Sequence, residues 1–172
     1  MQQWLIPIQK KLRRLKTEIV DTRKTTPGLR SFEKYAVRVG GCTNHRFSLS
    51  DAVLIKDNHI AGAGSIGNVV DMVKKSIPHT VKIEVETENL DEVLEAITAK
   101  ADIIMLDNMD NEMTSKAVEL IRSKSSYITI GASGNMTLDR LKDVAKTSVD
   151  IISVGSLTHS VAALDICLKF KK

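Results

Sequence analysis

The sequence of 172 residues predicts an α/β fold, a small or incomplete parallel β/α barrel of six to seven strands. Three observations support this prediction. Short apolar runs recur along the chain, polar or glycine residues follow each run, and a segment of helical period comes next. Nearly continuous apolar runs are typical of parallel strands covered by helices, and alternation of strand and helix indicates β/α units.

Six apolar runs are candidate strands: 19–20, 53–55, 81–85, 103–106, 127–130 and 151–154. Their spacing and the polar residue at each carboxyl end favour a barrel. A complete eightfold barrel typically needs about 250 residues, which is more than this chain has. We therefore expect a smaller or incomplete barrel, with an open sheet as the alternative.

The helices between these strands are indicated by their first residues. Four residues of capping type precede apolar patterns of helical period: Ser65, Asn89, Asp110 and Thr137. Asn89 is followed at the capping-box spacing by Glu92. We expect each crossover between parallel strands to be right-handed.

Residues 1–17 differ from the rest and are predicted to be a divergent, helical N-terminal segment, with the barrel domain over 18–172. One face of the predicted helix is apolar: Leu5, Ile8, Leu12 and Leu15. Lysines and arginines occupy the other face, and a solvated helix is the main interpretation. Contact with a membrane surface or a nucleic acid is the alternative.

Composition narrows the function classes. The formal net charge of +4 favours anionic ligands but is too small to indicate nucleic-acid binding. Cys42 and Cys167 have neither zinc-site nor CxxC spacing, so we expect reduced thiols and a cytoplasmic location. No apolar run approaches the roughly 20 residues that span a bilayer, so we expect no membrane role.

Polar side chains follow the predicted strands, where β/α barrels bind their ligands. They come after four successive strands: Asp21, Arg23 and Lys24, then Lys56, Glu86 and Asp107. Basic residues are also concentrated early in the chain: Arg23, Lys24, Arg30, Lys34, Arg38, His45, Arg46 and Lys56. Arginine can hold a carboxylate or phosphate by two hydrogen bonds, so a small polyanion fits. Each cation taken singly is more often a solvated surface residue.

Two glycine-containing turns, 131–135 and 155–159, follow the last two strands and lead into predicted helices. Backbone N–H groups at a helix N-terminus attract phosphate, although short loops also use glycine for backbone reasons alone. Glu86 and Asp107 suit ribose hydroxyls or a magnesium–phosphate complex, unless they cap a helix or pair with a lysine. Glu84 should lie on the same strand face as Glu86, so spacing cannot choose between them.

Eight motifs together resemble quinolinate phosphoribosyltransferase over about residues 18–172. They are DTRKTTPGLR at 21–30, EKYAV at 33–37, NHR at 44–46, LIKDNH at 54–59, EVE at 84–86, LDN at 106–108, ASGN at 132–135 and VGSLTH at 154–159. The resemblance implies transfer of phosphoribosyl from phosphoribosyl pyrophosphate to quinolinate with decarboxylation. The products are nicotinate mononucleotide, pyrophosphate and CO2, in NAD biosynthesis, with Mg2+ as cofactor.

The resemblance also implies residue roles. The quinolinate carboxylates and neighbouring phosphates would be held by Arg23, Lys24, His45, Arg46 and Lys56. Glu86 and Asp107 would face the ribose and metal, and with Lys24 and Lys56 they are the catalytic candidates. The phosphate-binding turns would contain Ser133, Gly134, Gly155 and His159.

The chain also departs from that family. Members carry a domain ahead of the barrel, whose basic residue completes the partner subunit's site in a homodimer or higher homo-oligomer. A truncated, inactive phosphate-binding barrel is therefore one alternative. A molybdate-linked paralogue is another, although the motif at 54–59 favours the quinolinate enzyme. Cys42 replaces a usual third glycine, with a modest expected effect on its turn.

Overall fold

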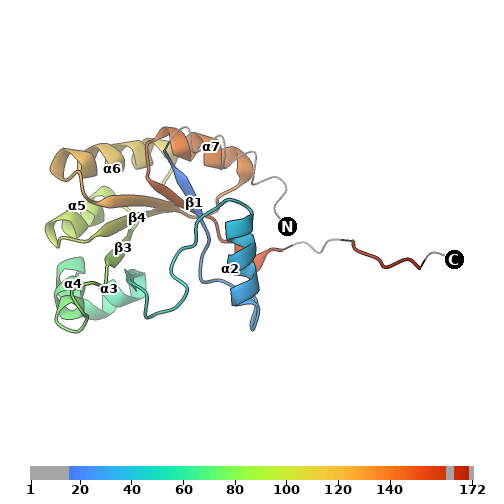
Figure 1. Ribbon diagram of the computed structural model, residues 1–172. Helices are drawn as coiled ribbons and strands as arrows, with labels where there is room; N and C mark the ends of the chain where they lie inside the picture. The colour runs from blue at the N-terminus through green and yellow to red at the C-terminus, as the bar shows by residue number, and fades with distance from the viewer. Residues whose placement is uncertain (1–15, 162–164, 171–172) are drawn as a thin grey trace.

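The protein forms one parallel sheet of six strands in a computed structural model that describes residues 16–161 and 165–170 (Figure 1). The strands are β1 Glu18–Val20, β2 Val53–Ile55, β3 Ile83–Thr87, β4 Ile103–Asp107, β5 Thr129–Ser133 and β6 Ile151–Ser153. Each predicted run overlaps one of these strands, so the α/β prediction is confirmed.

The sheet is an incomplete barrel with the strand order β1-β6-β5-β4-β3-β2. Within the described residues, β1 and β2 form its two edges. Instead of pairing with β2, the end of β1 makes a single parallel bridge from Val20 to Thr43. The loop between α2 and β2 therefore lies beside β1, where a closed barrel would place a neighbouring strand.

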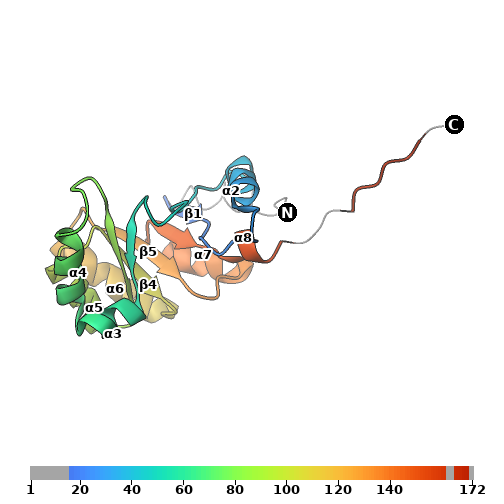
Figure 2. The ribbon, with the colours of Figure 1, turned by 90° about the horizontal axis from the view of Figure 1, so that it is seen from below.

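Helices follow most strands. They are α2 Arg30–Val39, α3 Asp57–Ala63, α4 Ile66–Lys74, α5 Leu90–Thr98, α6 Asn111–Lys124, α7 Leu138–Lys146 and α8 Ser156–His159. Figure 2 shows α4, α5, α6 and α7 together along one face of the sheet, whereas α2 lies apart from them near β1 and α8. The predicted helix within residues 1–17 falls almost wholly outside the described residues.

The four predicted N-caps are confirmed. The side chains of Ser65, Asn89, Asp110 and Thr137 each accept a hydrogen bond from the backbone N–H three residues on. The capping box is shifted by one residue, because the Glu92 carboxylate accepts from the N–H of Glu88 at 2.7 Å. Local sequence therefore determines where these helices begin.

The core lies between the sheet and its helical layer. Alternate strand residues point into it, and seven apolar side chains among them are at most 1% exposed: Ile19, Ile55, Val85, Ile104, Leu106, Ile130 and Ile152. Burial of each such side chain contributes about 1.5–3 kcal/mol. Because strand side chains alternate, the intervening residues point to the other face, and the polar strand ends belong to that set.

Cys42 does not disturb its turn. The positive φ of 86° belongs to Gly41, and Cys42 itself is buried against the core without a left-handed backbone. The turn therefore needs no glycine at position 42, which is why the substitution is accommodated.

The described helices are all too short or too polar to cross a membrane.

Candidate active site

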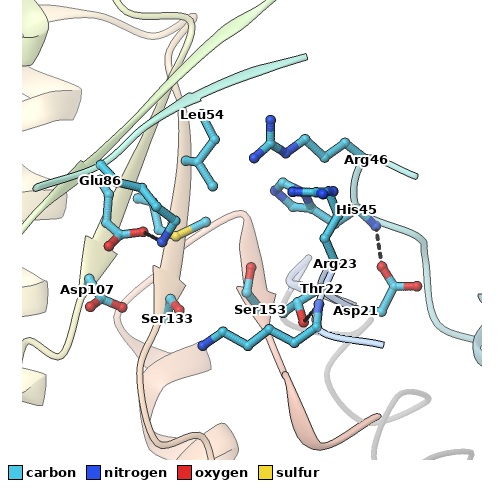
Figure 3. A pocket seen from close by; sticks show the side chains of 13 residues that line it. Asp21, Thr22, Arg23, His45, Arg46, Leu54, Glu86, Asp107, Ser133 and Ser153 are labelled. Atoms are coloured by element: carbon cyan, nitrogen blue, oxygen red, sulfur yellow. Dashed lines mark hydrogen bonds and ion pairs between the residues drawn. The ribbon is translucent and has the colours of Figure 1, made fainter. Parts of the chain in front are cut away.

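A cavity of about 400 Å³ opens at the carboxyl ends of the strands. It is called the cationic pocket below. Every strand contributes at least one lining residue from its end: Asp21, Lys56, Glu86, Asp107, Ser133 and Ser153. Figure 3 shows Arg23, His45 and Arg46 on one side of this cavity, with Glu86 and Asp107 on the other. Parallel strands thus bring together side chains that are far apart in sequence.

A second cavity of about 480 Å³, the glycine pocket, adjoins the first. It contains both predicted glycine turns, through Gly134, Gly155 and His159. The two pockets share five lining residues: Thr22, Lys24, Asp107, Ser133 and Ser153. A ligand in one pocket would therefore meet a ligand in the other at this shared boundary.

The basic residues of the early cluster divide into two groups. Five of them line the cationic pocket: Arg23, Lys24, His45, Arg46 and Lys56. Arg30, Lys34 and Arg38 line neither pocket. Lys34 is only 3% exposed at its side chain and is bound to Asp21, and Arg30 donates to Thr25 Oγ1 and to the Arg23 carbonyl. Lys34 and Arg30 thus hold the loop together. Composition and spacing had not separated these cations from the pocket cations, whereas the family resemblance had implied the five that line the pocket.

Asp21 is the centre of a buried network that shapes this wall. Its carboxylate accepts from Lys34 Nζ at 2.6 Å, from Asn44 Nδ2 at 2.7 Å and from the His45 N–H at 2.8 Å. A carboxylate out of water needs such partners to remain charged. Asp21 therefore joins the end of β1 to the loop that carries His45 and Arg46.

Arg23 and Arg46 make the wall strongly cationic. Burial, and next the charge of Arg23, lower the pKa of Arg46, while Glu84 and Asp51 oppose that change. Arginine still keeps its proton in proteins. Arg23 Nε is buried without a hydrogen-bond partner. The wall thus has repulsion between like charges and an unused donor, and an anionic ligand would relieve both.

Glu84 and Glu86 both lie on the pocket side of β3, as their spacing predicted, but in different surroundings. Glu84 is 1% exposed and contacts His45, whereas Glu86 lines the cationic pocket and pairs with Lys56 Nζ at 2.5 Å. The alternative that a lysine pairs with the carboxylate therefore holds for Glu86. It does not remove Glu86 from the cavity.

Asp107 ends β4 and lines both pockets. One of its oxygens accepts from Asn108 Nδ2 at 2.7 Å. No group of three or more His, Cys, Asp or Glu side chains suited to a metal ion occurs in the part of the chain that the structure describes. Mg2+ does not need a complete set of protein ligands, because one or two carboxylates together with substrate phosphates usually hold it. Glu86 and Asp107 fit this arrangement.

The turn after β5 is shorter than predicted. Residues 131–133 belong to β5, and only Gly134 and Asn135 have left-handed backbones, at φ 94° and 44°. A Cβ at Gly134 would lie 2.8 Å from the Asn108 backbone nitrogen. Arg140 donates to the Gly134 carbonyl at 2.6 Å. Gly134 is therefore required both by its conformation and by the close approach of the β4 loop.

The turn after β6 leads directly into α8. A Cβ at Gly155 would lie 2.7 Å from His159 Nε2, so a side chain at position 155 would displace the imidazole. Thr158 is fully buried, and its hydroxyl donates to the Lys24 carbonyl at 2.6 Å. This bond connects the last strand-end turn to the loop after the first strand. The first and last strands of the chain, which are neighbours in the sheet, thus contribute to one site.

Sequence reasoning missed several lining residues. Ser153 ends β6 as Ser133 ends β5, so the rule of polar residues at strand ends would have found it. Leu54 and Met105 are apolar and had no such signal. His59, by contrast, lines neither described pocket, because its Nδ1 accepts the Lys56 N–H and caps α3.

Comparison with known proteins gives a consistent result. The family model described as quinolinate phosphoribosyl transferase, C-terminal domain, matches residues 6–169. A probable carboxylating nicotinate-nucleotide pyrophosphorylase of Synechocystis is 56% identical over 153 residues, or 89% of this chain and 52% of the relative. Its counterpart in Bacillus subtilis is 48% identical over 151 residues, or 88% and 51%.

A solved structure is similar as well. The nicotinate-nucleotide pyrophosphorylase from Francisella tularensis has a TM-score of 0.83 and 46% identity, with coverage of 94% of this chain and 57% of that one. The chain thus spans about half the length of the curated relatives it matches.

Proposed function

The chain belongs to the quinolinate phosphoribosyl transferase family, and from this premise we propose that it transfers phosphoribosyl from phosphoribosyl pyrophosphate to quinolinate. The products would be nicotinate mononucleotide, pyrophosphate and CO2, as expected of a decarboxylating pentosyltransferase in NAD biosynthesis. One observation carries the proposal. A cationic pocket and a glycine pocket adjoin and share Lys24, Asp107 and Ser133.

Quinolinate would occupy the cationic pocket. It carries two adjacent carboxylates on a pyridine ring, and guanidinium groups bind carboxylates through paired N–H donors. These carboxylates would be held by Arg23, His45 and Arg46. Lys24 and Lys56 would add further positive charge to the pocket. The orphaned Arg23 Nε supports this assignment, because a buried donor without an acceptor is costly.

The phosphoribosyl donor would occupy the glycine pocket. The phosphates would be surrounded by Ser133, Gly134, Gly155 and His159, since all four line this pocket. Glu86 and Asp107 would face the ribose and, together with phosphate oxygens, would hold Mg2+. The metal would neutralise charge on the departing pyrophosphate.

The reaction would take place at the boundary. The bond from ribose C1 to the pyrophosphate oxygen breaks, and its electron pair leaves with pyrophosphate. The carboxylates of Glu86 and Asp107 stabilise the oxocarbenium-like sugar, as fixed charges do for glycosyl transfer. The pyridine nitrogen then donates its lone pair to C1. The cationic ring next accepts the electron pair released as CO2 departs, and a proton takes its place.

We further infer a cytoplasmic location and a homodimer or higher homo-oligomer, as the family resemblance implies. In such an assembly a basic residue of the partner subunit would reach the cationic pocket.

The test is an assay for nicotinate mononucleotide from the purified chain with quinolinate, phosphoribosyl pyrophosphate and Mg2+. We expect turnover that falls about 10²–10³-fold in Lys24→Ala and in Lys56→Ala, as for other groups that stabilise transition-state charge. Lys146→Ala is the matched control, because that lysine pairs with Asp143 on the exposed face of α7. Calorimetric binding of both substrates without any product would instead favour the inactive phosphate-binding barrel.

A further inference from the structure

Glu84 has a role that the proposed chemistry leaves open. It is 1% exposed in the interior of the sheet, where β2 and β4 flank it through Leu54 and Ile103. A buried carboxylate without a partner is costly, and such a group either finds a cation or takes up a proton. The side chains around Glu84 therefore have to explain why its carboxylate is buried.

Only one basic side chain contacts this carboxylate within the described residues. His45 Nε2 lies 2.9 Å from Glu84 Oε2, and the other oxygen, Oε1, is buried without a hydrogen bond. Arg46 acts on Glu84 through its charge but makes no ion pair with it. The imidazole of His45 is thus the direct partner of the Glu84 carboxylate.

The same contact fixes the orientation of His45. Asp21 Oδ1 accepts the backbone N–H of His45, and Lys34 Nζ donates to its carbonyl at 3.0 Å, so the backbone is held on one side. Glu84 holds ring nitrogen Nε2 on the other side. Nδ1, on the other edge of the ring, makes no hydrogen bond among the described residues, and His45 lines the cationic pocket.

We propose that Glu84 is a positioning residue that keeps His45 an imidazolium, so that Nδ1–H can donate to a carboxylate of the acceptor. This inference rests on the proposed function for the identity of the acceptor. A histidine with a fixed carboxylate partner has a defined tautomer and a stabilised charge. Glu84 therefore acts on the ligand only through His45.

The direction in which anion binding changes when Glu84 is removed distinguishes this role from direct repulsion between Glu84 and the anion. A carboxylate near an anion repels it, so removal of its charge alone would strengthen anion binding. If Glu84 acts through His45, its removal also removes the imidazolium and a charge-assisted hydrogen bond. Binding would then weaken. The two roles thus predict opposite results for one variant.

The experiment uses Glu84→Gln, His45→Gln and the double variant of the full chain. We expect Glu84→Gln to weaken quinolinate binding about 10–100-fold by calorimetry. We also expect the double variant to bind no more weakly than His45→Gln, because the effects of two groups that act as one unit do not add. Glu33→Gln is the matched control, since Glu33 is a buried carboxylate that accepts the Thr26 N–H and lines neither pocket.

A second measurement does not depend on the acceptor. The ¹⁵N resonances of the His45 ring, identified by their loss in His45→Gln, should show an imidazolium at neutral pH in the unmodified chain and a neutral ring in Glu84→Gln. An imidazolium that persists in Glu84→Gln, or tighter quinolinate binding by that variant, would overturn the proposal. If the unmodified chain binds no quinolinate, the proposed function fails while the ring spectra still decide the role of Glu84.

Discussion

The cationic pocket and the glycine pocket adjoin, yet they are built on different physical principles. In the cationic pocket the functional groups are side chains, and two buried contacts hold them: the ion pair of Lys34 with Asp21 and the contact of His45 with Glu84. In the glycine pocket the shape comes from the backbone. Gly134 and Gly155 lie where a Cβ would come within 3 Å of a neighbour.

This difference predicts what each pocket tolerates. The cationic pocket should be sensitive to loss of charge and indifferent to small changes in volume. The glycine pocket should be sensitive to a single added methyl group at Gly134. Two predictions test this contrast and a third tests the loop that carries Arg46, in order of decreasing effect.

The largest effect is expected for Asp21→Asn. This change keeps the size of the side chain but leaves Lys34, 3% exposed at its side chain, without its counter-charge. Loss of one partner of a buried ion pair costs about 3–5 kcal/mol. The measurement is the free energy of unfolding in urea.

Asp143→Asn is the control for that variant, because Asp143 and Lys146 form an exposed pair on α7. Exposed pairs contribute little, so we expect no measurable change there. A loss below about 1 kcal/mol in Asp21→Asn would contradict a charge-built pocket, since truncation of a buried pair should cost more.

A smaller effect on stability is expected for Gly134→Ala. The φ of 94° is unfavourable for alanine, and its Cβ would lie 2.8 Å from the Asn108 backbone nitrogen. Strain of this kind costs about 1–3 kcal/mol. Binding of phosphoribosyl pyrophosphate should be lost while quinolinate binding remains, which calorimetry with each ligand can measure.

Gly62→Ala is the matched control, because Gly62 lies within α3 and a Cβ there meets nothing within 4 Å. Alanine in a helix interior is favoured over glycine by about 0.5–1 kcal/mol, so this variant should be slightly more stable. Equal losses of both ligands in Gly134→Ala would show that the two pockets are not separable.

The smallest effect concerns the loop that carries Arg46. Hydrogen bonds from the Ser48 and Phe47 backbone N–H groups lower the pKa of Asp51 below its usual 3.8. A group with a lowered folded pKa contributes stability above the unfolded value, and this contribution is lost as pH falls through the folded pKa.

The wild-type chain should therefore lose more stability than Asp51→Asn as pH falls below 3.8. The measurement is the difference in unfolding free energy between the two chains across that range. The difference should be small, because Asp51 is exposed and solvent screens it. Parallel pH curves would show that the loop does not depend on this carboxylate.

The fold was largely predictable because its signals are local. Apolar runs marked all six strands, and Ser65, Asn89, Asp110 and Thr137 marked helix starts, since capping bonds span only three residues. Strand-end position also selected Lys56, Glu86 and Asp107, because parallel strands end at one edge of the sheet. No comparable local pattern in the sequence indicates that the barrel is open between β1 and β2.

The sequence by itself determined the elements, their order, the residue types at the strand ends and the family motifs, since spacing along the chain defines which face a residue occupies. Only the tertiary structure decided which charged groups remain available. Lys34 and Arg23 belong to the same basic stretch of the sequence. Asp21 forms an ion pair with Lys34, whereas Arg23 lines the cavity. Glu84 and Glu86 share a strand face, and contacts with the distant His45 and Lys56 give them different surroundings. Burial and partners depend on packing between distant segments, which spacing does not encode.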